Sequence, residues 1–335
     1  MISIDGSYGE GGGQIIRTAI ALSAITGEPC KIENIRYNRP NPGLQAQHIT
    51  AVKSVARLCG TDISVGIGDT SFVFEPKEIR GGFYEVDIGT AGAISLVIQS
   101  LMLPSLHAKH PVELSLKGGT HVKWSPSMDY MKSIFSYYMK RIGVDFSLNI
   151  ENYGFFPRGG GMVKINIKPA TPKALTITDR GNLIGYDAVS VASEDLRKSQ
   201  VAERQVNAVE NFFDLDKKDM NYVPSLSTGS SVHVSALFEN CVLGESSLGE
   251  RGKKAEEVGS EAAIGLKNQI NGHACLDRHM ADQLLPFLAF AKQDSSIRVS
   301  EITPHVLTNI WVIEQFLPVK FEVNEKEKII DVKVK

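Results

Sequence analysis

The chain opens with Ile2-Ser3-Ile4-Asp5-Gly6-Ser7-Tyr8-Gly9-Glu10-Gly11-Gly12-Gly13-Gln14, an apolar stretch followed by a glycine-rich turn. Apolar residues then recur every three to four positions, which predicts a helix from about Gln14 to Ile25. The rest of this segment predicts a strand, a second helix and two further strands, near Lys31–Ile35, Gln45–Leu58, Asp62–Val65 and Ser71–Glu75. The order is therefore βαβαββ.

The same order recurs roughly eighty residues later, which indicates an internal repeat. The second unit runs from a strand near Phe83–Asp87 to a strand near Met162–Ile167. A third unit starts at Ala174–Thr178 and resumes at the helix Met280–Phe290, so it skips a segment. Residues 180–273 are predicted to form an inserted small domain of βαββα order, a thioredoxin-like topology, while residues 1–179 and 274–335 form a large domain. The fold class is α+β, with three βαβαββ repeats packed around a helical core.

Composition excludes several classes of protein. The 335 residues are 42% hydrophobic and 22% charged, as in globular proteins rather than disordered or fibrous ones. No apolar run approaches the roughly 18 residues of a membrane span, and the first residues lack a signal-peptide pattern. A cytoplasmic protein is expected. A net charge of -2 gives no global positive field, so a nucleic acid would have to be bound locally.

The cysteines predict neither a zinc ribbon nor a thioredoxin-type redox centre. Cys30, Cys59, Cys241 and Cys275 form no CxxC pair, and buried free thiols are expected.

The glycine-rich turn is a candidate phosphate site. It lies where bare backbone N–H groups and the positive end of a helix dipole attract anions, although it matches neither the Walker A nor the GxGxxG pattern. Glu10 is an acidic residue inside this turn, an arrangement that a divalent cation between carboxylate and phosphate would stabilise. The alternative for Glu10 is a solvated turn residue.

Two further features suit the same chemistry. Arg17, Arg36 and Arg39 lie near the turn in sequence or in the next loop, and guanidinium groups bind phosphate oxygens in pairs. His305 follows Pro304 at a predicted helix start, where a neutral imidazole could act as a nucleophile toward phosphorus. The alternatives are ordinary surface arginines and a histidine satisfied by backbone groups.

The chain carries five further motifs or extended motifs, Asp5–Gln14, Asn41–His48, Gly154–Gly161, Ala281–Gln283 and His305–Asn309. Taken together, these motifs resemble the RNA 3′-terminal phosphate cyclase family nearly from end to end. The resemblance implies an ATP-dependent enzyme that converts the 3′-phosphate of an RNA to a 2′,3′-cyclic phosphate. It also implies a histidine–AMP intermediate, formed on His305, from which AMP passes to the RNA end.

The resemblance further assigns candidate site residues. Glu10 matches the position that holds a divalent metal, Mg²⁺ or Mn²⁺, and Arg36, Arg39 and Gln47 match positions that handle phosphate. The nucleotide-contacting positions correspond to Gln99, His279, Met280, Ala281, Asp282 and Gln283, with Pro126 packing on the adenine. Asp282 is expected to orient either His305 or the ribose. His279 departs from the aromatic residue common in bacterial members, and imidazole stacks on a base more weakly than a phenol ring.

Two other functions compete with this one. A non-catalytic relative acting in ribosome biogenesis would share the fold but would not need His305, Glu10 and Asp282 together. An enolpyruvyl transferase is built from similar units, but it needs six of them rather than three plus an insert. RNA is the expected partner, no membrane association is expected, and a homo-oligomer remains open.

Overall fold

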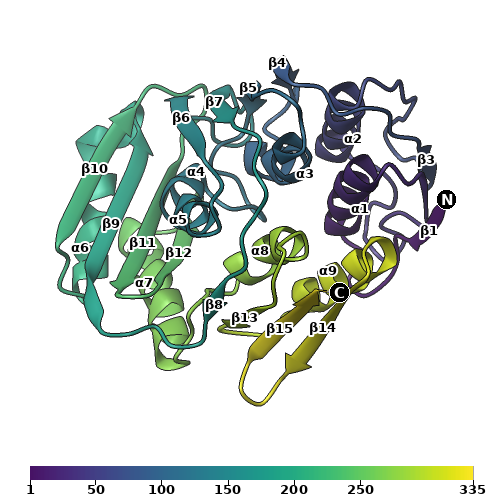
Figure 1. Cartoon of the computed structure of the whole chain (residues 1–335). Helices are drawn as coiled ribbons and strands as arrows, with labels where there is room; N and C mark the ends of the chain where they lie inside the picture. The colour runs from purple at the N-terminus through teal and green to yellow at the C-terminus, as the bar shows by residue number, and fades with distance from the viewer. Residues whose placement is uncertain (335) are drawn as a thin grey trace.

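Each repeated unit is built on its own sheet in the computed structural model, which describes residues 1–334 and confirms the α+β fold class (Figure 1). The first unit contains β1 (Ile2–Asp5), α1 (Gly13–Thr26), β2 (Cys30–Glu33), α2 (Ala46–Leu58) and β3 (Phe72–Phe74). Strands β1 and β2 are parallel, and β3 pairs antiparallel with β2. Both helices lie on one side of this sheet, toward the centre of the molecule.

The second and third units share one strand order. The second contains β4 (Gly82–Asp87), α3 (Ile94–Leu106), β5 (Val112–Gly118), α4 (Met128–Tyr130), a π-helical turn (Met131–Phe135), α5 (Ser136–Arg141), β6 (Phe146–Asn152) and β7 (Gly161–Ile167). The third contains β8 (Thr176–Ile177), α8 (Met280–Leu288), β13 (Ser295–Arg298), α9 (Pro304–Phe316), β14 (Val319–Asn324) and β15 (Ile329–Val334). Their sheets run β4-β5-β7-β6 and β8-β13-β15-β14, so the last strand of each unit lies between the second and the third.

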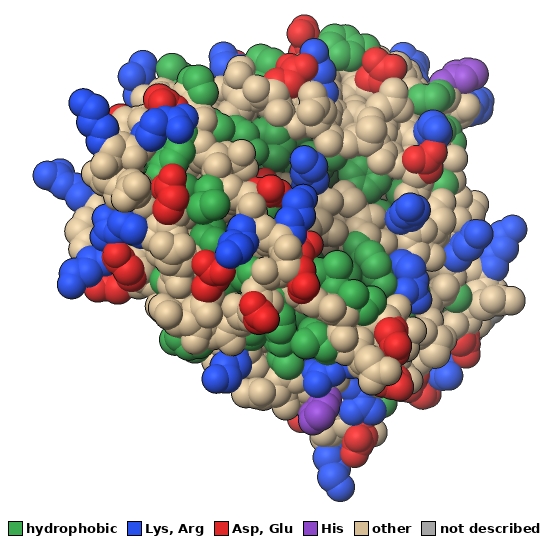
Figure 2. All heavy atoms as spheres, turned by 90° about the vertical axis from the view of Figure 1, so that its left-hand side faces the viewer, with side chains coloured by type: hydrophobic (Ala, Val, Ile, Leu, Met, Phe, Trp, Pro, Cys, Tyr) green, Lys and Arg blue, Asp and Glu red, His purple; other side chains and the backbone are tan. Residues whose placement is uncertain are grey.

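The segment skipped by the third unit, which we call the insert (residues 180–273), carries a four-stranded sheet and two helices. It contains β9 (Leu183–Ser193), a 3₁₀ turn (Glu194–Ser199), α6 (Val201–Glu210), β10 (Lys217–Val223), β11 (Ser230–Phe238), β12 (Val242–Leu248) and α7 (Ala255–Asn271). The sheet order is β10-β9-β11-β12. Figure 2 shows the side of the molecule on which the insert lies, where basic and acidic side chains are interspersed and form no field of one sign.

Two details of the predicted strand pattern are wrong. Asp62–Val65 forms no strand, although Val65 is buried, because β3 occupies the position beside β2 and no other strand pairs with this segment. The predicted βαββα order of the insert lacks β10, which makes the observed order βαβββα. Strand β10 is an edge strand with the sequence KKDMNYV. Its side chains are mostly polar and exposed, so it lacks the alternation of apolar residues by which a strand is predicted.

Apolar packing joins the helices of the three units into one core. Helix α1 contacts α2, α3 and α9, while α8 contacts α3 and α9. Fully buried side chains such as Ile16, Ile98 and Leu284 belong to one continuous cluster, each contributing about 1.5–3 kcal/mol by leaving water. The four cysteines are buried and free, as expected. Among residues 1–334, no helix combines the length and the apolar character that crossing a membrane requires.

The units contact one another in a cyclic order. In each unit, a residue in the first turn of the second helix contacts the next unit. The contact lies at or just before the first helix of that unit. His305 of α9 reaches Gln14 of α1, Gln47 of α2 lies beside the N–H of Ala93 before α3, and Tyr130 of α4 bonds Asp277 before α8. The helices α1, α3 and α8 line one pocket at the centre of this arrangement.

Candidate active site

The glycine-rich turn is shaped by close contacts that only glycine allows. Gly9 has φ +56°, and a Cβ there would lie 2.5 Å from Thr308 Oγ1 of α9. A Cβ on Gly13 would overlap the imidazole of His48. Gly12 precedes α1 without a side-chain cap, and no acidic residue occupies the first turn of the helix. The first N–H groups of α1 are therefore available to an anion.

His305 lies directly against this turn. It follows Pro304 in the first turn of α9, where Thr303 caps the helix by accepting a hydrogen bond from the N–H of Val306. Its Nδ1 lies 2.5 Å from Oε1 of Gln14, and its Nε2 lies 3.2 Å from Oε2 of Glu10. Both nitrogens of the ring thus face residues at the start of the chain.

Gln14 determines which nitrogen of His305 carries the proton. The Nε2 amide group of Gln14 donates to Oδ2 of Asp282 and to the backbone oxygen of His305, at 3.0 and 3.1 Å. This orientation leaves only Oε1 of Gln14 to face Nδ1, so Nδ1–H donates to it. In the neutral imidazole the lone pair then lies on Nε2, on the side of Glu10.

The surroundings of His305 favour the neutral ring. Burial lowers the pKa of His305, and the positive charges of Arg17 and Arg39 lower it further, while Glu10 opposes them. The net direction is down from the ordinary value. A neutral imidazole with its lone pair on Nε2 is a competent nucleophile.

A pocket lies beside His305 where the first helices of the three units meet. Its polar lining includes Gln14, Arg17, Gln99, Asp282, Gln283 and Asn309. Burial lowers the pKa of Arg17 to about 10 and raises the pKa of Asp282 to about 7. Because an arginine at this pKa is still charged at neutral pH, the pocket offers a fixed guanidinium to an anionic ligand.

Sequence reasoning missed the side chains that support this pocket. Thr18 donates to Asn309, and Asn309 donates to the backbone oxygen of Asp282, both at 2.7 Å. The sequence offered one signal for Gln14. It stands where the GxGxxG pattern has its last glycine, and a polar side chain at that position can form hydrogen bonds that glycine cannot.

The expected phosphate-binding residues are only partly brought together. Nη2 of Arg39 lies 3.4 Å from Oε2 of Glu10, beside His305. Arg36 instead donates to the backbone oxygens of Asn41 and Gly43 in its own loop. Gln47 belongs to α2, and its side chain reaches the start of α3, with Oε1 3.5 Å from the backbone nitrogen of Ala93.

The expected nucleotide-contacting residues also differ in placement. Gln99, Asp282 and Gln283 line the pocket, whereas Pro126 is in the loop before α4 and does not. Met280 and Ala281 are fully buried, so their side chains face the core. His279 begins α8 with part of its side chain exposed and one nitrogen against Glu245 of the insert.

Glu10 is the candidate metal ligand, although it belongs to no cluster of ligating side chains in the described part of the chain. Residues 1–334 contain no group of three or more histidine, cysteine or acidic side chains placed to hold a metal ion. A lone carboxylate beside the uncapped start of a helix still fits Mg²⁺, which is commonly held by one or two carboxylates together with substrate phosphates and water.

Comparison with known proteins decides the family. The sequence model of "RNA 3′-terminal phosphate cyclase" matches residues 8–323. The chain belongs to the RNA 3′-terminal phosphate cyclase family. It is 43% identical over 340 residues to the protein of that name from Methanopyrus kandleri, covering 98% of this chain and 96% of the relative. The corresponding protein of Pyrococcus furiosus is 44% identical over 331 residues, covering 96% and 95%.

Family membership confirms the resemblance seen in the sequence. A third relative, from Methanosarcina barkeri, is 41% identical and is covered over its whole length, as is this chain. The chain is therefore an enzyme of an ATP-dependent ligase family, and the enolpyruvyl transferase alternative is dropped.

Proposed function

We propose that this enzyme uses ATP to convert the 3′-terminal phosphate of an RNA to a 2′,3′-cyclic phosphate through an AMP adduct on His305. The observation that carries the proposal is the contact of Nδ1 of His305 with Gln14, which leaves the lone pair on Nε2 beside Glu10. The names of the relatives support the reaction. The geometry at His305 supports the covalent intermediate.

In the first step, Nε2 of His305 attacks the α-phosphorus of ATP. A phosphorus–nitrogen bond forms, the bond from the α-phosphorus to the bridging oxygen breaks, and pyrophosphate leaves. The ring becomes positively charged as the bond forms, and its Nδ1–H stays hydrogen-bonded to Gln14. This strengthens the hydrogen bond in the transition state, which is where a contact must strengthen to accelerate a reaction.

Two kinds of group could neutralise the charges that develop on phosphate. The start of α1 has no side-chain cap, and the guanidinium of Arg39 lies 3.4 Å from Glu10, the carboxylate next to His305. Arg17 lies deeper, in the pocket. Phosphoryl transfer depends mainly on such positioning and charge neutralisation.

Glu10 would hold the divalent metal, with Mg²⁺ or Mn²⁺ as the candidates. When bound there, the metal would neutralise phosphate charge and offset the repulsion between the carboxylate and the α-phosphate. Oε2 of Glu10 lies 3.2 Å from Nε2 of His305, so the carboxylate and the nitrogen lone pair would repel each other unless a cation lay beside them.

Two further steps complete the reaction. An oxygen of the RNA 3′-phosphate attacks the α-phosphorus of the adduct, the phosphorus–nitrogen bond breaks, and His305 returns to its neutral form. The vicinal 2′-hydroxyl of the RNA then attacks the activated 3′-phosphorus. Its proton is released to solvent, AMP leaves, and the cyclic phosphate remains.

The deciding experiment is incubation with α-³²P-ATP and Mg²⁺ or Mn²⁺, followed by denaturing electrophoresis. A label that is labile in acid and stable in alkali identifies a phosphoramidate, and His305→Ala should abolish it while the protein stays folded. Covalent AMP on His305→Ala would refute the assignment. A folded wild-type protein that takes no label with either metal would favour the non-catalytic relative acting in ribosome biogenesis.

We also propose that the protein is cytoplasmic and that it associates with itself.

A further inference from the structure

Consecutive residues of the glycine-rich turn lie against positions of α9 that are spaced three residues apart. The pairs are Glu10–His305, Gly9–Thr308 and Tyr8–Trp311. His305 and Trp311 are six residues apart, which separates them by about 9 Å along the helix axis. An aromatic ring at this distance from the proposed nucleophile is within the reach of one nucleotide.

The Tyr8–Trp311 pair is stacked flat at the surface of the protein. The ring centroids are 4.0 Å apart, and the ring planes differ by 14°. Trp311 is only partly buried, and 43% of Tyr8 is exposed. Because Trp311 covers one face of the Tyr8 ring, the exposed part of this ring is its other face and its edge. The pair thus presents a flat aromatic surface to solvent.

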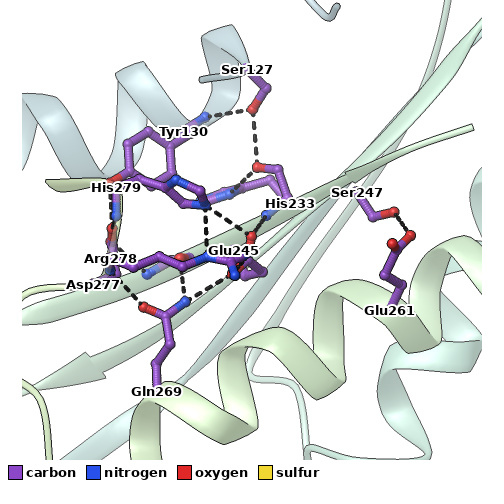
Figure 3. A network of polar contacts seen from close by, with 12 residues as sticks. Ser127, Tyr130, His233, Glu245, Ser247, Glu261, Gln269, Asp277, Arg278 and His279 are labelled. Carbon is purple, nitrogen blue, oxygen red and sulfur yellow. Dashed lines mark hydrogen bonds and ion pairs between the residues drawn. The ribbon is translucent and has the colours of Figure 1, made fainter. Parts of the chain in front are cut away.

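A buried tyrosine of the same chain shows how a ring is placed when it packs in the interior. Tyr130 stands edge-on to both His233 and His279. Its hydroxyl donates to Asp277 at 2.7 Å (Figure 3). Edge-on contacts of this kind are common among packed aromatic side chains. An exposed ring gains less from burial than such a ring does, so packing alone does not account for the position of Tyr8.

The backbone of the turn holds Tyr8 in place without a ligand. The N–H of Tyr8 donates to the backbone oxygen of Asp5 at 3.2 Å, and the N–H of Gly11 donates to the backbone oxygen of Tyr8 at 2.9 Å. Nδ2 of Asn38, in the next loop, donates to the backbone oxygen of Ser7 at 3.4 Å. The ring is therefore positioned in advance, which lowers the ordering cost of binding.

The groups next to the stack suit a nucleic acid better than an apolar partner. The guanidinium of Arg39 lies 3.4 Å from Glu10, and the start of α1 has no side-chain cap. A cation and bare backbone N–H groups suit a phosphate, while a flat aromatic surface suits a base. Proteins bind single-stranded RNA by stacking its unpaired bases on aromatic side chains and contacting its backbone with positive charges.

We propose that Tyr8, supported by Trp311, is the surface on which the base of the 3′-terminal nucleotide of the RNA stacks, while the 3′-phosphate of that nucleotide lies beside His305. The inference rests on the proposed function and deepens it by assigning a subsite to the RNA. Every base has a π-face, so this subsite accepts any terminal base. Tyr8 acts on the binding of RNA and not on the formation of the AMP adduct.

The test compares two 5′-fluorescent oligoribonucleotides with a 3′-phosphate, whose terminal nucleotide carries either adenine or no base. Binding is measured by fluorescence anisotropy in the His305→Ala background, where no covalent step occurs. Loss of the base should raise the Kd about tenfold while Tyr8 is present. This comparison needs no variant of Tyr8 to fold, and equal binding of the two RNAs overturns the proposal.

Variants of Tyr8 then assign the difference to its ring. Tyr8→Leu can still pack on Trp311 but has no π-face, so it should weaken binding of the adenine-ended RNA about tenfold and make the two RNAs bind alike. Tyr8→Phe keeps a ring and should preserve the difference. Tyr37→Leu is the matched control, because Tyr37 is a tyrosine of the loop between β2 and α2 that is 69% exposed. It should also preserve the difference, and a difference that persists in Tyr8→Leu overturns the proposal.

A purely structural role of Tyr8 would appear in the first step of the reaction. If Tyr8 only fixed the turn that carries Glu10, Tyr8→Leu would slow adenylation as strongly as it weakens RNA binding. We expect the adenylation rate at saturating ATP, measured with His305 intact, to change less than about twofold, and a matching loss overturns the proposal. Because RNA binding in the His305→Ala background needs no chemistry, a failure of the proposed function would appear separately, as wild-type protein that takes no label from ATP.

Discussion

Gln14→Ala tests the role given to the Nδ1 contact of His305. In the resting enzyme this contact is a hydrogen bond between neutral groups, worth about 1 kcal/mol. In the transition state the ring gains positive charge, and a charge-assisted hydrogen bond is worth about 1.5–3 kcal/mol. The difference of about 0.5–2 kcal/mol corresponds to a rate that is about 2- to 30-fold lower. The single-turnover rate of adenylation at saturating ATP should therefore fall by this factor.

Gln99→Ala is the matched control for this experiment. Gln99 is a glutamine on α3 that lines the same pocket, and no hydrogen bond joins it to His305 within the described residues. We expect it to raise the ATP concentration needed for half-maximal adenylation and to keep the saturating rate within about twofold. Gln14→Ala also removes a donor from Asp282, so urea unfolding must confirm that the variant is folded under the assay conditions.

A clear result would refute this reasoning. If Gln14→Ala adenylates at the wild-type rate with saturating ATP, the contact does not set the reactive form of His305. An equal loss of saturating rate in Gln99→Ala would show instead that any damage to the pocket slows the reaction.

Three further predictions concern the turn and its support. Glu10→Ala should adenylate slowly and with a weaker dependence on Mg²⁺ concentration; full activity at low Mg²⁺ would contradict the role given to Glu10. Gly9→Ala should lower the free energy of unfolding in urea by about 1–3 kcal/mol, because φ is +56° and the new Cβ meets Thr308; an unchanged unfolding curve would show that the turn adapts. Burial and the charges of Arg17 and Arg36 lower the pKa of His48 to about 3. Since the unfolded chain takes up this proton near pH 6.5, the free energy of unfolding should fall by up to about 2 kcal/mol between pH 6.5 and 5, and His48→Gln should remove that part of the decrease.

The repeat pattern was predictable because helix and strand periodicity marks the side that faces the core. Where the prediction is wrong, there is a physical cause. Ile63 and Val65 do face the core, as their alternation predicts, but a strand also requires a neighbour to pair with, and β3 already pairs with β2. A π-helical turn at Met131–Phe135 joins α4 to α5, and it depends on local hydrogen bonds that an apolar pattern does not report.

At the site, sequence patterns identified residues whose chemistry is unusual for their position. Glu10 stands in the glycine-rich turn and His305 at a helix start, and Oε2 of Glu10 lies 3.2 Å from Nε2 of His305. The supporting contacts were not predictable, because an amide such as Gln14 meets partners that are distant in sequence, Asp282 and His305. The function itself came from resemblance to a family, and neither periodicity nor composition would have reached it.

The cyclic contact between the units has a consequence for synthesis of the protein. Gln14 and His305 are 291 residues apart, and they meet only where the third unit packs on the first. During translation, α1 and the glycine-rich turn leave the ribosome long before α9. The nascent chain can fold its early units while it still lacks His305, the proposed nucleophile, since domains fold in order as they emerge. On the proposed mechanism, adenylation would begin only after the last helix has packed on the first unit, and a chain that stops short of α9 would fold in part without this activity.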